Sequence, residues 1–223
     1  MAAGVGSRMR PLTDTTPKPM LRILGKPLLE YIFESLPDEI DEVLIIVGYK
    51  REQIEQHFGP SFSGKKVTYV VQEKATGTAD ALALCLPHLT NGERFLVLNA
   101  DDIYGKESIE RCLKYPRAVL VAEVPDPRPF GVVQVDGRGI ATELVEKPEH
   151  PKSNLIVPGV YVLDTHLFEY APVPAKNGEK FFPTMLAQML KDYPVYTERT
   201  GFWINCTTPG DIPEAEKRLA GRA

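Results

Sequence analysis

Apolar residues recur at two different spacings in the first half of the chain. After Pro27, they recur every three or four positions over residues 28–36, which predicts a helix with one buried face. Val43 to Val47 is a continuous apolar run, which is typical of a parallel strand buried on both faces. Extended to residue 98, the pattern predicts helices at 28–36, 50–58 and 78–86 and strands at 43–47, 67–71 and 95–98.

The second half of the chain departs from this alternation. Strand-like segments follow one another there and are separated by turns rich in Pro, Gly and Asp. Alternating strands and helices imply right-handed βαβ units, to which the later strands would add hairpins and edge strands. The sequence therefore predicts an α/β fold with a doubly wound, mixed, Rossmann-like sheet. The expected later elements are strands at 118–124, 131–135, 140–145 and 156–163 and helices at 181–192 and 209–220.

The length of 223 residues suits a single domain, since the chain contains no internal repeat and no long linker. We expect this domain, residues 1–223, to have two halves, at about 1–115 and about 116–223. The net charge of -4 provides no basic field, so nucleic acid and membrane surfaces are not expected partners. The three cysteines show no metal-site spacing, and we expect reduced thiols in a cytoplasmic protein.

The segment from Ala2 to Arg8 is short, rich in glycine and ends in a cation. Gly4 and Gly6 would let backbone N–H groups approach phosphate oxygens, and Arg8 would neutralise their charge. The alternative for these glycines alone is a tight surface turn. Further on, Lys18 lies between two prolines, which predicts an extended and rigid backbone. A fixed cation there would stabilise developing charge, and the alternative is an exposed loop lysine.

Residues 2–36 carry the motif A-A-G-x-G-x-R-x-x-P-x-T, then P-K-P-M and G-K-P. This combination resembles the sugar-1-phosphate nucleotidylyltransferases. It is similar in particular to glucose-1-phosphate thymidylyl- and uridylyltransferases and to the N-acetylglucosamine-1-phosphate uridylyltransferase domain. The resemblance implies a nucleotide-binding first half and a sugar-phosphate-binding second half. In that family an apolar strand precedes the loop, whereas only Met1 precedes Ala2 here, so we expect an earlier start or a rearranged sheet.

The resemblance also implies the residues of a nucleotide site. The loop residues Ala3, Gly4 and Gly6 would wrap the triphosphate, while Arg8 and Lys18 would stabilise the transition state. The pattern Q-x-x-x-x-G-T resembles the base-recognition element of the family, which here is Gln72, Gly77 and Thr78. A Gln amide offers the donor and the acceptor that a pyrimidine edge needs, which favours UTP or dTTP. The alternative for Gln72 is an ordinary polar residue at a strand end.

Asp101 follows the strand predicted at 95–98, where the loops of an α/β sheet meet a ligand. Its carboxylate suits Mg²⁺, and the resemblance makes it a metal ligand. The W-x-D element of the family is matched by Trp203-Ile204-Asn205, so Asn205 is the implied second ligand, through its carbonyl oxygen. Asp102 could share this role, or the acidic pair could cap a helix N-terminus.

Three short elements of the second half resemble the sugar-binding part of the family. They imply that Gly131 lies against the sugar, that Glu146 accepts hydrogen bonds from its hydroxyls and that Lys147 binds its phosphate. Val157 and Gly159 would line the sugar pocket. The alternative for Glu146 and Lys147 is a solvated ion pair at a strand end.

These features predict an enzyme of the EC 2.7.7 type that joins a nucleoside triphosphate to a hexose 1-phosphate and releases pyrophosphate at a Mg²⁺ site. A homodimer is one expected assembly. Two alternatives stay open. A mannose-1-phosphate guanylyltransferase would need a roomier base pocket. A non-catalytic domain that senses nucleotide sugars would be expected to lack Arg8, Lys18 or Asp101, and all three are present.

Overall fold

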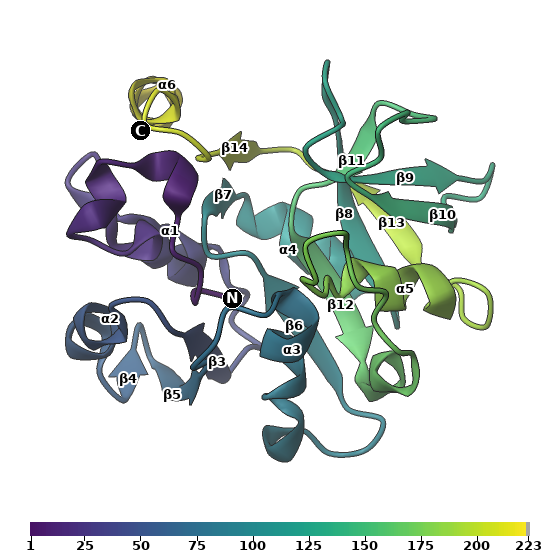
Figure 1. The fold of residues 1–223 in the computed structure, drawn as a ribbon, viewed down its shortest axis with the longest axis horizontal. Helices are drawn as coiled ribbons and strands as arrows, with labels where there is room; N and C mark the ends of the chain where they lie inside the picture. The colour runs from purple at the N-terminus through teal and green to yellow at the C-terminus, as the bar shows by residue number, and fades with distance from the viewer. Residues whose placement is uncertain (222–223) are drawn as a thin grey trace. The chain divides into compact units, whose positions relative to one another are not determined.

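The computed structural model describes residues 1–221, which form two compact units (Figure 1). The first unit contains Met1–Ala75, Asn99–Lys106 and residues 202–221. The second unit contains Thr76–Leu98 and Glu107–Gly201. The first unit is therefore assembled from three separate segments of the chain, and the second unit from two. Within residues 1–221, no helix is both long enough and apolar enough to cross a bilayer.

The first unit contains a three-stranded sheet in the order β3-β5-β4. β3 (Glu42–Val47) and β5 (Lys65–Val71) run parallel and are connected through α2 (Arg51–Phe58), which confirms the predicted βαβ unit. β4 (Ser61–Phe62) pairs antiparallel with β5. The other elements of this unit are β1 (Arg22–Ile23), β2 (Lys26–Pro27), α1 (Leu28–Ser35), β7 (Asp102–Tyr104), β14 (Trp203–Asn205), α6 (Asp211–Ala220) and 3-10 turns at Ser7–Met9, Leu12–Asp14 and Lys18–Met20.

A buried apolar cluster fixes the small ladder formed by β7 and β14. Ile103 and Ile204 face each other across this antiparallel ladder and are almost fully buried. They pack with Met9 from the N-terminal turn and with Leu28 and Tyr31 from α1. Because burial of these side chains stabilises the unit, the polar residues on either side of them are held at fixed positions.

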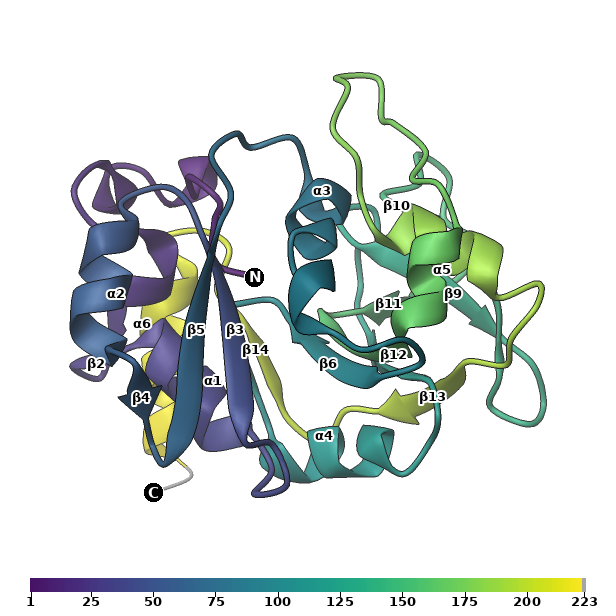
Figure 2. The same ribbon diagram turned by 90° about the horizontal axis from the view of Figure 1, so that it is seen from below.

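The second unit is a mixed sheet of seven strands in the order β10-β9-β11-β8-β12-β6, with β13 parallel to β8. Figures 1 and 2 show α3 and α5 on one face of this sheet and α4 on the other. Its strands are β6 (Arg94–Leu98), β8 (Ala118–Glu123), β9 (Gly131–Val135), β10 (Ala141–Glu146), β11 (Leu155–Val157), β12 (Val160–Asp164) and β13 (Tyr196–Arg199). Its helices are α3 (Thr78–Ala83), α4 (Lys106–Leu113), α5 (Pro183–Met189) and 3-10 turns at Leu86–His88 and Thr165–Glu169.

The single strand predicted at 156–163 is wrong, because the structure divides this segment into β11 and β12. Pro158 has no N–H to donate to a ladder, and Gly159 has a φ of 115°, which few other residues adopt. The break lets β11 pair with β9 and β8, while β12 pairs with β6 and β8. Helix α4 and the short strands β1, β2, β4, β7, β13 and β14 were not predicted.

Met1 and Ala2 adopt the geometry expected for the end of a strand. The N–H of Ala2 donates to the carbonyl of Ile46 at 2.8 Å, and Ala2 forms a parallel bridge with Val47. On the other side, the N–H of Ala100 donates to the carbonyl of Met1 at 3.2 Å. The backbone immediately before the glycine loop is therefore paired on both sides within the first unit.

Candidate active site

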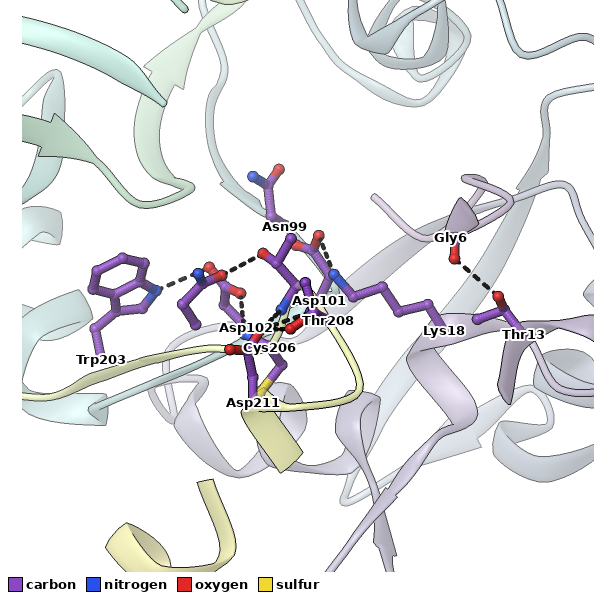
Figure 3. Close-up of polar contacts among 12 residues, drawn as sticks. Gly6, Thr13, Lys18, Asn99, Asp101, Asp102, Trp203, Cys206, Thr208 and Asp211 are labelled. Carbon is purple, nitrogen blue, oxygen red and sulfur yellow. Dashed lines mark hydrogen bonds and ion pairs between the residues drawn. The ribbon is translucent and has the colours of Figure 1, made fainter. Parts of the chain in front are cut away.

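Lys18 and Asp101 form the central contact of the candidate site in the first unit. The Nζ atom of Lys18 lies 2.9 Å from Oδ2 of Asp101, although the two residues are 83 positions apart in the chain (Figure 3). Lys18 is buried, whereas the side chain of Asp101 is 39% exposed. The carboxylate can therefore bind a further cation from solvent while Lys18 holds it in place. Lys18 begins a 3-10 turn and is not in an extended segment as predicted, because Pro17 and Pro19 precede and enter that turn.

Asp102 faces a different set of partners from Asp101. Its Oδ1 accepts a hydrogen bond from the N–H of Cys206 at 3.0 Å, and its Oδ2 accepts one from the indole N–H of Trp203 at 2.9 Å. Burial, and then repulsion by the Asp101 carboxylate, raise the pKa of Asp102 to about 7. The possibility that this acidic pair caps a helix is wrong, since Asp102 begins β7. Asp102 ties β7 to the chain that follows β14.

Asn205 lies directly opposite Asp102 in the ladder of β7 and β14. Its Oδ1 accepts a hydrogen bond from the hydroxyl of Thr207 at 2.6 Å, which fixes the orientation of the amide. Asp101 and Asn205, the two implied metal ligands, are therefore attached to the same short ladder. Within residues 1–221, no group of three or more His, Cys, Asp or Glu could hold a metal. An oxygen pair of this kind suits Mg²⁺, which keeps waters and takes substrate phosphates as further ligands.

The glycine loop packs onto the turn that carries Lys18. Gly6 has a φ of 67°, and a Cβ at this position would lie 3.0 Å from Cγ2 of Thr13 and 3.1 Å from Cβ of Lys18. The carbonyl of Gly6 also accepts a hydrogen bond from the hydroxyl of Thr13 at 2.9 Å. After Gly6, Met9 is fully buried and anchors the turn, while Gly4 and Arg8 are exposed. The loop therefore has a fixed end at Gly6 and an exposed backbone and cation on either side of it.

A second glycine, Gly48, brings the loop next to the implied base-recognition residue. A Cβ on Gly48 would lie 3.0 Å from the carbonyl oxygen of Ala3 and 3.1 Å from that of Gln72. Gln72 is held at the end of β5 by its N–H, which donates to the carbonyl of Val47 at 2.8 Å. Ala3 and Gln72 thus meet at the carboxyl ends of β3 and β5, where α/β sheets bind ligands. Gly48 was not predicted as part of the site, although its place directly after an apolar strand was a signal.

In the second unit, three of the implied sugar-site residues lie side by side across neighbouring strands. Gly131 of β9 is in register with Glu146 of β10 on one side and with Val157 of β11 on the other. A Cβ on Gly131 would lie 3.2 Å from Oε2 of Glu146, so glycine leaves room beside this carboxylate. The side chain of Glu146 is 16% exposed, and burial raises its pKa while Lys147 lowers it. Gly159 follows two residues after Val157, at the break between β11 and β12.

Lys147 has a constrained backbone and a partly exposed ammonium group. Its φ of 46° is in the left-handed region, and its N–H donates to the carbonyl of Phe130 at 3.0 Å. The ammonium lies 3.5 Å from Oε1 of Glu146 and 4.4 Å from the centre of the Phe181 ring. This differs from a freely solvated ion pair at a strand end, because the lysine is constrained at both its backbone and its ammonium.

Gly77 and Thr78 belong to the second unit, and their close neighbour there is Lys180. Gly77 has a φ of 113°, and a Cβ on it would lie 2.2 Å from the carbonyl oxygen of Lys180. The N–H of Phe182 donates to the hydroxyl of Thr78 at 3.2 Å. The structure therefore gives Gly77 a packing reason to be glycine. Lys180 was not predicted as part of the site, and no motif in the sequence identifies it.

Comparisons with known proteins identify the family of the chain. Residues 1–221 match the protein family described as NTP_transferase, nucleotidyl transferase. The bifunctional protein GlmU of Methanocaldococcus jannaschii is 38% identical over 98% of this chain and 53% of its own length. The UTP–glucose-1-phosphate uridylyltransferase AglF of Haloferax volcanii is 32% identical over 98% of this chain and 94% of its own length. The chain spans about half the length of the GlmU relatives that it matches.

Two solved structures show the same fold. A UDP-glucose pyrophosphorylase complexed with UDP-glucose has a TM-score of 0.86, 26% identity and coverage of 100% of this chain and 97% of its own. A putative glucose-1-phosphate thymidylyltransferase from Bacillus anthracis also has a TM-score of 0.86, with 30% identity and coverage of 97% and 92%. The predicted α/β, Rossmann-like nucleotidyltransferase fold is confirmed. The chain belongs to the nucleotidyl transferase family, as the motif at residues 2–36 indicated.

Proposed function

We propose that the chain joins a nucleoside triphosphate, with UTP or dTTP favoured, to a hexose 1-phosphate, giving a nucleotide sugar and pyrophosphate. The contact between Lys18 and Asp101 carries this proposal. It places a buried cation and an exposed carboxylate together, beside a glycine loop that packs onto the same turn. The names of AglF and of the solved relatives support a sugar 1-phosphate and a uridine or thymidine nucleotide.

Mg²⁺ fits the oxygens of Asp101 and Asn205, and when bound it would supply positive charge to the phosphates of both substrates. The side chains of the chain then have separate tasks. Arg8 and Lys18 take up negative charge on the departing pyrophosphate, and the backbone of Ala3, Gly4 and Gly6 holds the triphosphate. In the second unit, Lys147 holds the phosphate of the sugar, and Glu146, Gly131, Val157 and Gly159 hold its ring.

The reaction is a direct displacement at phosphorus. A phosphate oxygen of the sugar 1-phosphate forms a bond to the α-phosphorus, and the bond from that phosphorus to the bridging oxygen of the β-phosphate breaks. The electron pair leaves with pyrophosphate. No general base is needed, because the attacking phosphate is already largely ionised near neutral pH. Positioning and charge stabilisation are therefore the tasks that remain for the protein.

Gln72 would recognise the base through its amide, with Gly77 and Thr78 as the second part of the same element. A substrate matrix tests the proposal and its choice of base. The purified chain is mixed with each of four nucleoside triphosphates and with the 1-phosphates of glucose, N-acetylglucosamine and mannose, and pyrophosphate release is measured. We expect release that requires a divalent metal and is fastest with UTP or dTTP. If pyrophosphate release is fastest with GTP and mannose 1-phosphate, the guanylyltransferase alternative is supported instead. If no combination of substrates gives release, the proposal is contradicted.

A non-catalytic sensing domain is the other alternative, and the ion pair of Lys18 and Asp101 argues against it. A cytoplasmic location remains part of the proposal and is supported by three free, buried cysteines. A homodimer stays a prediction.

Replacing Lys18 with methionine should reduce turnover far more than stability. Methionine keeps the volume of the buried stem, and the exposed Asp101 carboxylate can be hydrated when it loses its partner, so we expect a loss of stability of about 1 kcal/mol or less. Loss of a fixed cation should lower kcat by about 10²- to 10³-fold. Thermal melting and steady-state kinetics would measure the two effects.

Lys26 provides a matched control for this substitution. It forms an ion pair with Glu34 at 2.6 Å in the same unit but lies outside the proposed site. Lys26→Met should therefore leave kcat unchanged. If Lys18→Met melts like the wild type and also turns over like it, Lys18 does not have the proposed role.

A further inference from the structure

The segment Lys180–Phe182 is fixed by its backbone to the start of α3. The N–H of Lys180 donates to the carbonyl of Thr76 at 3.0 Å, and its carbonyl accepts from the N–H of Ala79 at 2.9 Å. The next bond in this series joins the N–H of Phe182 to the hydroxyl of Thr78. Because both backbone groups of Lys180 are bonded and Gly77 lies in direct contact with them, this segment cannot shift without moving the Gly77–Thr78 element.

Side chains on both sides of Phe181 strengthen this anchorage. The ring of Phe182 is almost fully buried and packs edge-on against Tyr161 of β12, with 4.7 Å between ring centres. The ammonium of Lys180 lies 3.3 Å from a carboxylate oxygen of Asp80 in the first turn of α3. Phe181 is thus presented by a segment that is tied down at the residue before it and at the residue after it.

Phe181 directs the face of its ring toward Lys147. The Nζ atom of Lys147 lies 4.4 Å from the ring centre, well within the range of a cation–π interaction. A lysine side chain has several freely rotating bonds, and the carboxylate of Glu146, at 3.5 Å, constrains the ammonium only loosely. The ring adds a second constraint from a different direction.

A neutral ring has an advantage over a second carboxylate at this position. A carboxylate would cancel the charge of the ammonium and would repel an incoming phosphate. The ring attracts the ammonium through its quadrupole and leaves the positive charge available. The ring therefore constrains the ammonium without adding a second negative charge beside that of Glu146.

We propose that Phe181 is a positioning residue for sugar 1-phosphate binding: it holds the Lys147 ammonium through its ring face and is itself anchored to the Gly77–Thr78 element. The inference rests on the proposed function, in which Lys147 binds the sugar phosphate. It adds a residue to that site and connects the sugar-phosphate lysine to the base-recognition element within the second unit.

The test compares Phe181→Leu with Phe181→Tyr, using UTP and glucose 1-phosphate. Leucine keeps an apolar side chain but has no ring face, whereas tyrosine keeps the face. We expect Phe181→Leu to raise the KM for glucose 1-phosphate about 3- to 10-fold, which corresponds to loss of one cation–π interaction. The KM for UTP should stay within about twofold of the wild-type value, because the substitution keeps the backbone hydrogen bonds between Lys180–Phe182 and the start of α3. Phe181→Tyr should behave like the wild type in both values.

A double-mutant cycle with Lys147→Met separates positioning from direct contact with the sugar. If Phe181 acts through Lys147, then Phe181→Leu should have no further effect on KM in the Lys147→Met background. If the two substitutions instead raise the KM for glucose 1-phosphate by independent factors that multiply in the double variant, the inference is overturned. It is also overturned if Phe181→Leu leaves this KM unchanged in an enzyme whose wild type is active. A wild-type chain that releases no pyrophosphate from any substrate pair would instead overturn the proposed function, and the inference with it. Thermal melting of each variant identifies any that fail to fold.

Discussion

Replacing Asp101 with alanine should reduce turnover by about 10³-fold or more, because it removes the charged ligand of the proposed metal and one partner of the central ion pair. Asn205 alone offers a single neutral oxygen, which cannot hold Mg²⁺ against water. Addition of a chelator to the wild type should reduce turnover to a similar extent. Steady-state pyrophosphate release over a range of Mg²⁺ concentrations would measure both effects.

Asp101→Asn separates the loss of the metal ligand from a loss of stability more clearly than Asp101→Ala, since alanine also leaves the buried ammonium of Lys18 without a partner. Asparagine can still accept the hydrogen bond from Lys18, so the melting temperature of the Asp101→Asn variant should stay close to that of the wild type. Its turnover should nevertheless fall nearly as far as that of the alanine variant. Asp38→Ala, which removes a highly exposed carboxylate paired with Lys106, should change neither value. A folded Asp101 variant with wild-type turnover would contradict the metal-ligand role.

Replacing Gly77 with alanine should have the largest effect on stability. The added Cβ would lie 2.2 Å from the carbonyl oxygen and 2.5 Å from the nitrogen of Lys180, both of which are backbone atoms that cannot rotate away. The φ of 113° adds conformational strain for any residue with a side chain. We expect a loss of about 3–5 kcal/mol, or a fall in Tm of about 10 °C, measured by thermal or denaturant unfolding.

Gly178 is a matched control in the same unit. Its φ is 83°, and a Cβ there would have nothing within 4 Å, so Gly178→Ala introduces the backbone strain without the collision. We expect this variant to lose about 1 kcal/mol. Equal melting temperatures for the two variants would show that the segment at Lys180 does not press against Gly77 in solution.

The regular elements of the fold were predicted where hydrophobic spacing decides the structure. The parallel pair β3 and β5, with α2 between them, follows from two continuous apolar runs. The prediction of one strand at 156–163 was wrong because it followed the apolar residues and gave too little weight to Pro158, which interrupts a strand ladder. The ladder of β7 and β14 could not be predicted, since each strand has three residues and 98 residues lie between Tyr104 and Trp203.

The candidate site could be predicted only as a set of motifs, and its geometry depends on long-range pairing. Strand register brings Gly131, Glu146 and Val157 side by side, and nothing in the three separate motifs specifies that register. Lys180 and Phe181 belong to no motif, and their importance comes from contacts with residues 34 or more positions away. Asp102 was named as a possible ligand, whereas in the structure both of its carboxylate oxygens accept hydrogen bonds, one from Trp203 and one from Cys206.

The path of labelled phosphate is the most direct test of the central claim. The chain is incubated with Mg²⁺, glucose 1-phosphate and UTP that carries a label at the α-phosphorus or, in a parallel sample, at the γ-phosphorus. We expect the α label to enter the nucleotide sugar and the γ label to enter pyrophosphate, in equal amounts and only when both substrates and the metal are present. A folded chain that binds the nucleotide but leaves both labels in UTP, or that releases the γ label as orthophosphate, would contradict the central claim.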